Sequence, residues 1–273
     1  MICEYVCPNS PDADTATLET FQLVCKHIRD VVLNLQRLWA YVDDRMDVER
    51  IDLQLSRCGS VGVSVRIFYT NHFKVLPVED IPCKCSQWAL MKTSCARWIH
   101  ADISIEAGRI PPEPPFQHRC AKSLYELGLT SLESMVVDIR MMSDYNRDTF
   151  RWTMPRLQSV VCKSSSALEL PFTALLKHVV FKSATPEALS HSSVLEFVGK
   201  PIVESVTDLT FDFSPLSGLR FRHSSPDDTY FTTLEKVETF TVDLGHRNSF
   251  VEIDSVTLLK YFRLPNVKVA YFR

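Results

Sequence analysis

A short pattern of apolar positions, L-x-x-L-x-L with L standing for any large apolar residue, recurs along most of the chain. Each occurrence predicts one short strand, because side chains two positions apart on a strand face the same side. The first anchors of the successive units are Trp98, Leu132, Leu157, Leu176, Val206, Val237 and Leu264. In the last unit, the remaining anchors are predicted to be Val267, Val269 and Tyr271.

These units follow one another at roughly the spacing of a repeat protein. The interval between second anchors ranges from 19 residues (Val160 to Val179) to 34 residues (Ala101 to Met135), against about 20–29 residues in leucine-rich repeats. One strand with its return segment cannot bury its apolar side alone, so such units stack. We therefore predict an α/β protein whose residues 49–273 form a leucine-rich-repeat-like solenoid of short parallel strands. An ordinary mixed α/β domain is the alternative.

Three other features refine this architecture. The return segments contain helix-like stretches at 192–199 and 255–262, and the Pro-rich run 109–116 predicts an extended connector between units. A consensus repeat places Asn or Cys three positions after the last apolar anchor, where the side chain bonds buried backbone groups of the turn. The corresponding positions here carry other residues, namely Arg140, Ser165, Ala184, Ser214 and Gly245.

The first 67 residues show two further periodicities. Apolar side chains spaced alternately by three and four predict an amphipathic helix of about five turns. Its stripe is formed by Leu18, Phe21, Cys25, Ile28, Val32 and Leu35. Over residues 61–67, valines and an isoleucine alternate with glycine, serine and arginine, which predicts a strand with one buried face.

Composition narrows the classes of function. With 45% hydrophobic and 23% charged residues among 273, the chain has the balance of a folded globular protein. Its net charge of −3, without a basic stripe, lacks the electrostatic footprint of a nucleic-acid-binding protein. The seven glycines form neither G-x-G-x-x-G, nor a P-loop, nor G-x-S-x-G. That absence argues against the common nucleotide enzymes and against α/β-hydrolases.

The sequence predicts an intracellular protein, in the cytoplasm, the nucleus or both. No basic-then-apolar leader opens the chain, and no apolar run reaches the roughly 18 residues of a membrane span. Nine cysteines, an odd number, are better explained as reduced thiols than as disulfides. We expect neither nucleic acid nor a membrane as a partner.

Side chains capable of catalysis or metal binding do not form convincing sites. One group has partial zinc-ligand character but lacks the usual close ligand pairs, namely His72, Cys83, Cys85 and Cys95. His100 and Asp102 are expected on a solvated strand face, and the acidic pairs at 43–44 and 227–228 in polar turns. We therefore expect no catalytic residue, no cofactor and no metal.

Residues 23–39 carry the most specific motif. They read LVCKHIRDVVLNLQRLW and resemble the second half of the F-box of a large fungal family, V-C-x-x-W-R-x-x-A-x-x-x-x-x-L-W. The matching positions are Val24, Cys25, Arg29, Leu38 and Trp39, and Ile28 stands where the family usually has Trp. Residues 55–59, LSRCG, resemble the L-x-R-S-G segment that follows the F-box in this family, with Cys58 in place of Ser.

The resemblance implies that residues 1–48 are partial F-box helices. An F-box docks a substrate receptor onto a Skp-type adaptor of a cullin-RING ubiquitin ligase. The residues implied in that contact are Val24, Cys25, Ile28, Leu38 and Trp39. The family's first helix opens with Leu-Pro-x-Glu, whereas residues 1–8, MICEYVCP, resemble only the end of such a helix. The resemblance thus implies an N-terminally truncated F-box, through a misplaced start codon or a lost docking end, and weak adaptor binding.

By this resemblance the chain is expected to be a substrate-recognition subunit of an SCF-type ubiquitin ligase, without enzymatic activity of its own. The alternative is a stand-alone repeat protein for protein–protein interaction, and an enzyme of unrecognised type ranks last. If the strands are parallel and stacked, residues between the inward anchors line one concave face. That face is either a site for a protein substrate or a plain solvated surface. Its residues are Asp138, Arg140, Lys163, Lys182, Asp212, Asp243 and Lys268.

Overall fold

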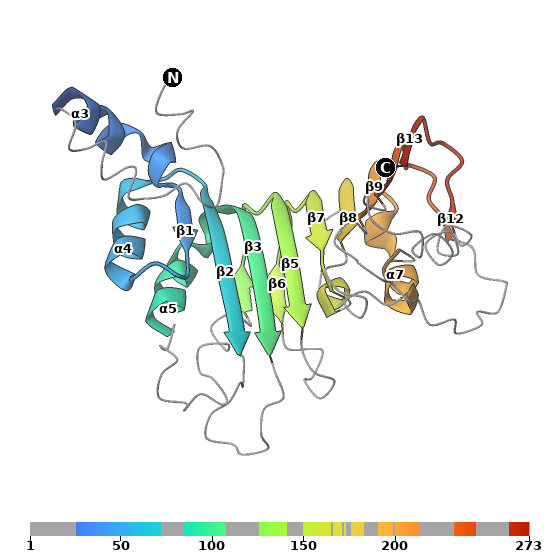
Figure 1. Cartoon of the computed structure of the whole chain (residues 1–273), viewed down its shortest axis with the longest axis horizontal. Helices are drawn as coiled ribbons and strands as arrows, with labels where there is room; N and C mark the ends of the chain where they lie inside the picture. Colours follow the sequence, from blue (N-terminus) through green and yellow to red (C-terminus); the bar gives the residue numbers. More distant parts are fainter. Residues whose placement is uncertain are drawn as a thin grey trace, which may run out of the picture.

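The protein is built on one long parallel sheet, seen in a computed structural model (Figure 1). The structure describes residues 26–71, 85–107, 126–140, 150–164, 166–170, 172, 176–182, 191–198, 200–212, 232–243 and 262–272. Nine strands pair side by side in the order in which they occur along the chain, and every pairing is parallel. They are β1 (Tyr41–Asp43), β2 (Val63–Asn71), β3 (Trp98–Ala107), β5 (Ser134–Arg140), β7 (Ser159–Cys162), β8 (His178–Lys182), β9 (Asp208–Asp212), β11 (Thr239–Asp243) and β13 (Val269–Phe272).

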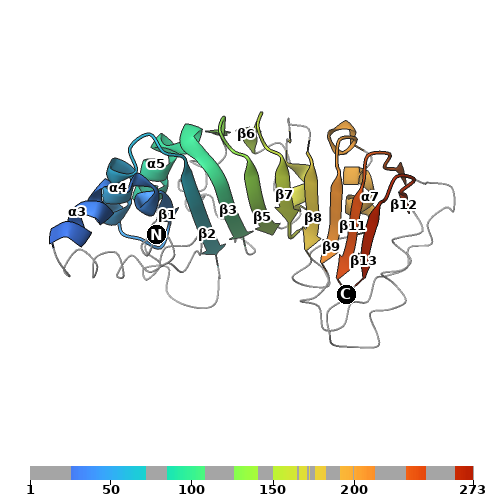
Figure 2. The same ribbon diagram turned by 90° about the horizontal axis from the view of Figure 1, so that it is seen from above.

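Few helices accompany this sheet among the described residues. The α-helices are α3 (Lys26–Asn34), α4 (Val48–Arg57), α5 (Cys85–Thr93) and α7 (His191–Val198). The 3-10 helices are Gln36–Trp39, Cys95–Arg97, Ser166–Glu169 and Pro201–Val203. Two small parallel sheets pair β4 (Glu126–Gly128) with β6 (Arg151–Thr153), and β10 (Thr232–Thr233) with β12 (Phe262–Arg263). Figure 2 shows α4, α5, α7, β6 and β12 on the same side of the long sheet. The predicted α/β class with parallel strands is confirmed.

The same backbone turn precedes several of the strands. Two apolar residues three positions apart close it, and the amide of the second donates to the carbonyl of the first. The N···O distances are 3.2 Å for Leu132 to Leu129, 3.3 Å for Leu157 to Met154 and 3.0 Å for Val206 to Val203. Both residues of each turn are buried, and the second is already the first anchor of its unit, so the turn adds one further apolar side chain to each unit. The full apolar pattern of a unit is therefore longer than the three anchors of L-x-x-L-x-L.

A ladder of backbone hydrogen bonds joins each turn to the previous one. The residue that follows the second apolar position donates its amide to the equivalent carbonyl of the unit before. The pairs, with N···O distances of 2.8–3.0 Å, are Glu133 to Ile99, Gln158 to Glu133, Lys177 to Gln158, Thr207 to Lys177, Glu238 to Thr207 and Lys268 to Glu238. This ladder extends the sheet pairing beyond the strands and satisfies backbone groups that would otherwise be buried without partners.

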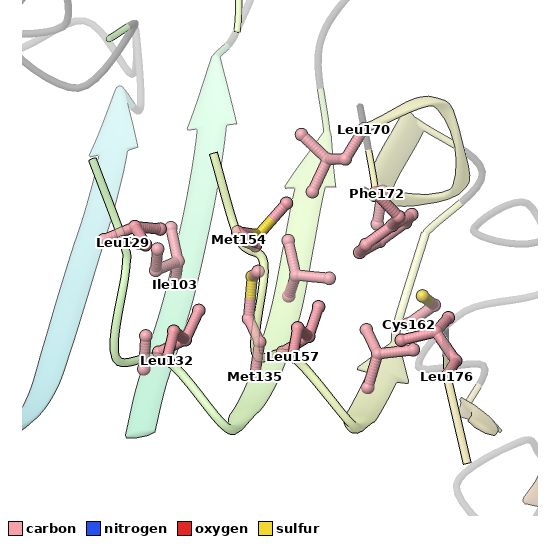
Figure 3. Packing of buried hydrophobic residues seen from close by; sticks show 14 of the residues in the cluster. Ile103, Leu129, Leu132, Met135, Met154, Leu157, Cys162, Leu170, Phe172 and Leu176 are labelled. Carbon is pink, nitrogen blue, oxygen red and sulfur yellow. The ribbon is translucent and has the colours of Figure 1, made fainter. Parts of the chain in front are cut away.

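The core lies between the sheet and the turns and helices on its covered side. Figure 3 shows equivalent side chains of successive units next to one another, with Leu132, Leu157 and Leu176 in one row. The first anchors predicted from the sequence, from Trp98 to Val237, are all buried. Towards the C-terminal half, aromatic rings take over, and Phe181 stacks on Phe211 at a centroid distance of 5.0 Å. Each fully buried side chain of this kind contributes about 1.5–3 kcal/mol of hydrophobic stabilisation.

The last unit lies three positions later in the chain than predicted, because Val267 takes the place of the first anchor that was assigned to Leu264. Ala270 pairs with Phe240 and Phe272 with Val242, so Ala270 and Phe272 are the inward residues of β13. Val269 and Tyr271 therefore lie on the opposite face. All four residues of this last strand are exposed, with Phe272 at 66%. The prediction was wrong because Val267, Val269 and Tyr271 are themselves apolar and alternate, so the pattern alone allows two registers.

Side chains other than Asn bond the buried backbone after the strands. The Ser164 hydroxyl donates to the carbonyl of Ile139 and accepts from its amide, both at 2.9 Å. At the start of the sheet, an Asp44 carboxylate oxygen accepts from the amide of Phe68 at 3.1 Å and from the indole N–H of Trp88 at 3.0 Å. Both side chains are almost fully buried. Residues 43–44, predicted to lie in a polar turn, are thus buried. The amide of Phe68 and the indole of Trp88 provide the Asp44 carboxylate with the hydrogen bonds that water would otherwise provide.

The N-terminal part differs from the predicted division at residue 48. β1 ends at Asp43 and is already a strand of the long sheet, so the sheet begins before the predicted F-box region ends. Of the predicted helix at 18–35, the structure describes Lys26–Asn34 as α3. The predicted helix at 192–199 is confirmed as α7. The Pro-rich run 109–116, the stretch 255–261 and the acidic pair 227–228 lie outside the described residues.

Candidate functional site

The sheet face opposite the core is the candidate binding site, and we call it the open face. It is formed by the strand residues that alternate with the buried anchors. The parallel register aligns them in three rows that cross the strands. Residues that lie far apart in the chain are therefore neighbours at the strand spacing of about 4.8 Å.

The middle row changes from charged to apolar and then to hydroxyl side chains. It begins with Asp43, Arg66 and Asp102, which pair in register on β1, β2 and β3. Val136, Val161 and Val180 follow on β5, β7 and β8, and we call these three the valine stripe. All three valines are half-buried. Thr210 and Thr241 continue the row on β9 and β11.

The outer row contains most of the charged residues predicted to line a partner surface. Asp138 pairs with Ser104, and Asp212 pairs with both Lys182 and Asp243. Lys163 directly follows β7, and its amide donates to the carbonyl of Val137 at 2.8 Å. The Lys182 ammonium forms an ion pair with Asp212 at 2.7 Å. Asp138, Lys163, Lys182, Asp212 and Asp243 thus share one region of the open face.

Two members of the predicted set lie elsewhere. Lys268 precedes β13, and its ammonium forms an ion pair with Glu238 at 2.8 Å in the turn ladder. Its assignment to the face between the anchors was wrong, because the last unit lies three positions later than predicted and Lys268 belongs to the turn ladder instead of the strand. Arg140 is the last residue of β5, and its side chain lies outside the described part of the structure.

The first row combines hydroxyl and imidazole groups. His100 Nδ1 lies 2.8 Å from the Ser134 hydroxyl on the neighbouring strand. Burial lowers the pKa of His100, against the opposing effect of the Asp102 carboxylate. Asp102 Oδ2 lies 3.8 Å from Arg66 Nε. His100 and Asp102 lie on the outward face of β3, as the alternation predicts, and both are half-buried there. The Ser134–His100 pair lies on regular strands, without the sharp turn that exposes a catalytic serine.

Farther along this row, His178 Nδ1 lies 2.9 Å from Asp208 Oδ2. Burial raises the pKa of Asp208, but hydrogen bonds from the hydroxyls of Thr207 and Thr239 and the neighbouring His178 outweigh it and hold the pKa below its ordinary value. Ser159 lies between Ser134 and His178 in the row. Its hydroxyl makes no hydrogen bond within the described residues.

The β1 edge of the open face is held by a compact polar cluster. Arg45 donates to both carboxylate oxygens of Asp43 at 2.6–3.0 Å, and the Tyr41 hydroxyl donates to Asp43 at 3.1 Å. Burial raises the pKa of Asp43, but the bonds from Arg45 outweigh it and leave the pKa below its ordinary value. Burial, together with the Asp43 charge, raises the pKa of Tyr41 to about 12.

The residues implied in adaptor contact are not all on the surface. Ile28 on α3 and Leu38 are half-buried, whereas Trp39 is only 2% exposed. The Trp39 indole N–H donates to the carbonyl of Val32 at 2.9 Å, and the Arg57 guanidinium lies 4.2 Å from its ring centroid. Trp39 is therefore a core residue, which corrects its assignment as a contact. Val24 and Cys25 lie outside the described residues.

Other candidate chemistry can be placed only in part. Cys95 is a free, half-buried thiol next to β3. The structure does not describe the other three residues of the group with partial zinc-ligand character. His72 and Cys83 lie outside the described residues, and the side chain of Cys85 is not described. No group of three or more His, Cys, Asp or Glu side chains suited to a metal ion is found in the described ranges. Within these ranges, no helix is long and apolar enough to cross a membrane.

Comparisons with protein-family models, with curated proteins and with solved structures find no match to this chain.

Proposed function

We propose that this chain is the substrate-recognition subunit of an SCF-type cullin-RING ubiquitin ligase. In this proposal it has a leucine-rich-repeat-like solenoid that binds protein substrates and an F-box-like region that meets a Skp-type adaptor. It acts by binding and catalyses no reaction itself, in the cytoplasm, the nucleus or both. Two independent features support this function, one in the repeat units and one in the F-box-like segment.

The strand order is the observation that carries the proposal. Each of the nine strands pairs with the next one in the chain, and the ladder from Ile99 to Lys268 repeats the same hydrogen bond in every unit described. In a doubly wound α/β sheet, by contrast, the strand order reverses at a switch point, where ligands bind. Sequential parallel stacking supports a solenoid, whose extended faces are used to bind other proteins.

The F-box resemblance gains support from a contact between its two separate motifs. Trp39 ends the F-box-like segment, Arg57 belongs to the LSRCG segment, and the Arg57 guanidinium covers the Trp39 ring. Gly59 ends that segment with a φ of 57°, in the left-handed region that favours glycine. Both motifs thus have residue types that their positions require.

The surface available for an adaptor is the outward side of α3. Val31 is 36% exposed there, and the half-buried Ile28, which also packs against the core, is one turn away. Interface energy concentrates in a few such apolar anchors. We propose that Val31 and Ile28 replace the buried Trp39 as the contact residues of this segment.

The test is an isothermal titration of a purified Skp-type adaptor. The titrated chain carries a complete Leu-Pro-x-Glu helix fused ahead of residue 1, and the 273-residue chain is measured alongside. We expect tight binding by the fused chain and weak binding by the 273 residues. Val31→Glu in the fused chain should abolish binding, because it places a charge in an apolar contact. Lys26→Glu, on the opposite side of α3, is the matched control and should leave binding nearly unchanged.

A fused chain that does not bind the adaptor, or that binds equally well with Val31→Glu, would refute the adaptor role. The second candidate would then stand, which is a repeat protein for protein–protein interaction without a ligase connection. The burial of Trp39 favours this alternative, since one of the five residues implied in adaptor contact is committed to the core.

A further inference from the structure

We propose that the open face binds an extended, acidic peptide segment, with two of its aliphatic side chains on the valine stripe and a carboxylate on Lys163. The inference rests on the proposed role of the open face as the substrate-binding surface, and it is independent of the ligase connection. It names the chemical class of the substrate segment, and it assigns Val136, Val161, Val180, Lys163 and Ser159 to its recognition.

The valine stripe provides the apolar part of the site. Val136, Val161 and Val180 pair in register on three neighbouring strands. They therefore cover about 10 Å across the sheet at the usual strand spacing. Positions i and i+2 of an extended peptide are about 7 Å apart, so two aliphatic side chains fit this length. On either side the row becomes polar, with Asp102 before the stripe and Thr210 after it, which limits the apolar contact to these three strands.

Lys163 provides the charge preference. It is half-buried beside Val161 and makes no ion pair within the described residues. The next lysine in the outer row, Lys182, already has Asp212 as its partner at 2.7 Å. Asp138 is only 7% exposed and has a polar contact of its own. Among the described side chains of the outer row, the positive charge that remains available at the stripe is thus that of Lys163, and it complements a carboxylate in the bound segment.

A hydroxyl on the other side of the stripe favours an extended segment over a helix. Ser159 lies in the first row of β7, two residues before Val161, and its hydroxyl has no hydrogen-bond partner among the described residues. An extended peptide has backbone N–H and C=O groups to offer such a hydroxyl, whereas a helix bonds these groups internally. Ser159 and Lys163 thus flank Val161 with a backbone partner on one side and a carboxylate partner on the other.

The experiment uses three fluorescein-labelled nonapeptides and the full chain, with binding followed by fluorescence anisotropy. The parent probe is Gly-Ser-Asp-Leu-Ser-Leu-Asp-Ser-Gly. One control replaces both aspartates with lysine, and the other replaces both leucines with serine. We expect the parent probe to bind saturably, with a dissociation constant below about 1 mM. Both control peptides should bind at least about tenfold more weakly.

Three protein variants locate the contact. Lys163→Glu should reverse the preference, so that the lysine probe binds more tightly than the aspartate probe. Val161→Thr, which keeps the shape of the side chain, should weaken the parent probe about threefold or more. Lys236→Glu makes the same charge change in an exposed turn and should leave binding unchanged. A thermal melt of each variant checks that the fold is retained.

Several results would overturn the proposal. Equal binding of the serine control would show that the parent probe binds by charge alone, and it would refute the role of the valine stripe. Absence of saturable parent binding, or a preference for aspartate that survives Lys163→Glu, would exclude the proposed segment. These readouts do not involve the adaptor. The adaptor titration with Val31→Glu can therefore refute the ligase role without refuting the peptide site, and the peptide experiment can refute the peptide site without refuting the ligase role.

Discussion

Phe211 is the central ring of an aromatic cluster in the core, so Phe211→Ala tests both the strand register and the packing. The ring is fully buried. Its centroid lies 5.0 Å from that of Phe181, 6.0 Å from Phe240 and 5.7 Å from Phe262. Removing it opens a cavity that borders three neighbouring elements, because these partners come from β8, β11 and β12.

The expected loss follows from the number of these contacts. A Phe→Ala change in a core costs about 3–5 kcal/mol of unfolding free energy. Each aromatic pair adds about 0.5–1.5 kcal/mol beyond its buried area, and Phe211 forms such pairs with at least Phe181, Phe240 and Phe262. We therefore expect Phe211→Ala to fall in the upper half of the range, about 4–5 kcal/mol. Phe240→Ala should cost about 3–4 kcal/mol, since Phe240 is 5% exposed.

Thr210→Ala is the matched control on the same strand. Thr210 points to the open face, so its replacement should cost about 0.5 kcal/mol or less. The assay is urea unfolding followed by circular dichroism, with the slope against urea compared between variants. A Thr210→Ala change as costly as Phe211→Ala, or a loss below about 1 kcal/mol for Phe211→Ala, would refute the register and the packing argument.

Two further predictions concern buried polar groups. Ser164→Ala leaves the amide and carbonyl of Ile139 without their partner and should lower the free energy of unfolding by about 1–3 kcal/mol. Ser159→Ala, the control, should lower it by about 0.5 kcal/mol or less. Equal losses of the two variants in urea unfolding would contradict the role of Ser164. Asp43→Asn should reduce the free energy of unfolding at pH 7 but not in acid. The folded pKa of Asp43 lies below its ordinary value of 3.8, so the ionised carboxylate stabilises the fold above pH 3.8. This stabilisation is lost as the pH falls through the folded pKa. Unfolding free energies of both proteins at pH 7 and pH 3 check this, and a difference that stays constant with pH would speak against it.

The sequence predicts most of the sheet, because alternation reports directly on burial. In the units that begin at Val206 and Val237, the L-x-x-L-x-L pattern predicts Phe211 and Phe240 on the inward face and Thr210 on the outward face, and the structure confirms all three. The same reasoning failed at Val269 and Tyr271, where both faces of the strand are apolar and the period cannot choose between them. The register there is set by pairing with β11, which no local pattern contains.

Buried polar contacts could not be predicted, because their partners are distant in the chain. Asp44 was expected in a solvated turn, but its carboxylate bonds the indole of Trp88, 44 residues away. Ser164 bonds Ile139 across 25 residues and lies one position before the serine that the consensus spacing selects.

Trp39 was assigned to a surface by its motif, whereas its aromatic character and its partner Val32 place it in the core.

The central claim is that this chain carries two partners at once, an adaptor at α3 and a substrate segment on the open face. Size-exclusion chromatography of the chain with the fused Leu-Pro-x-Glu helix and a Skp-type adaptor, on a column equilibrated with the labelled parent nonapeptide so that weakly bound peptide is retained, tests it most directly. The account predicts that adaptor and fluorescence elute together in one complex. It also predicts that omission of the chain separates them, and that Val31→Glu releases the adaptor while the peptide stays bound. Elution of the adaptor apart from the chain, or displacement of the peptide when the adaptor binds, would contradict it.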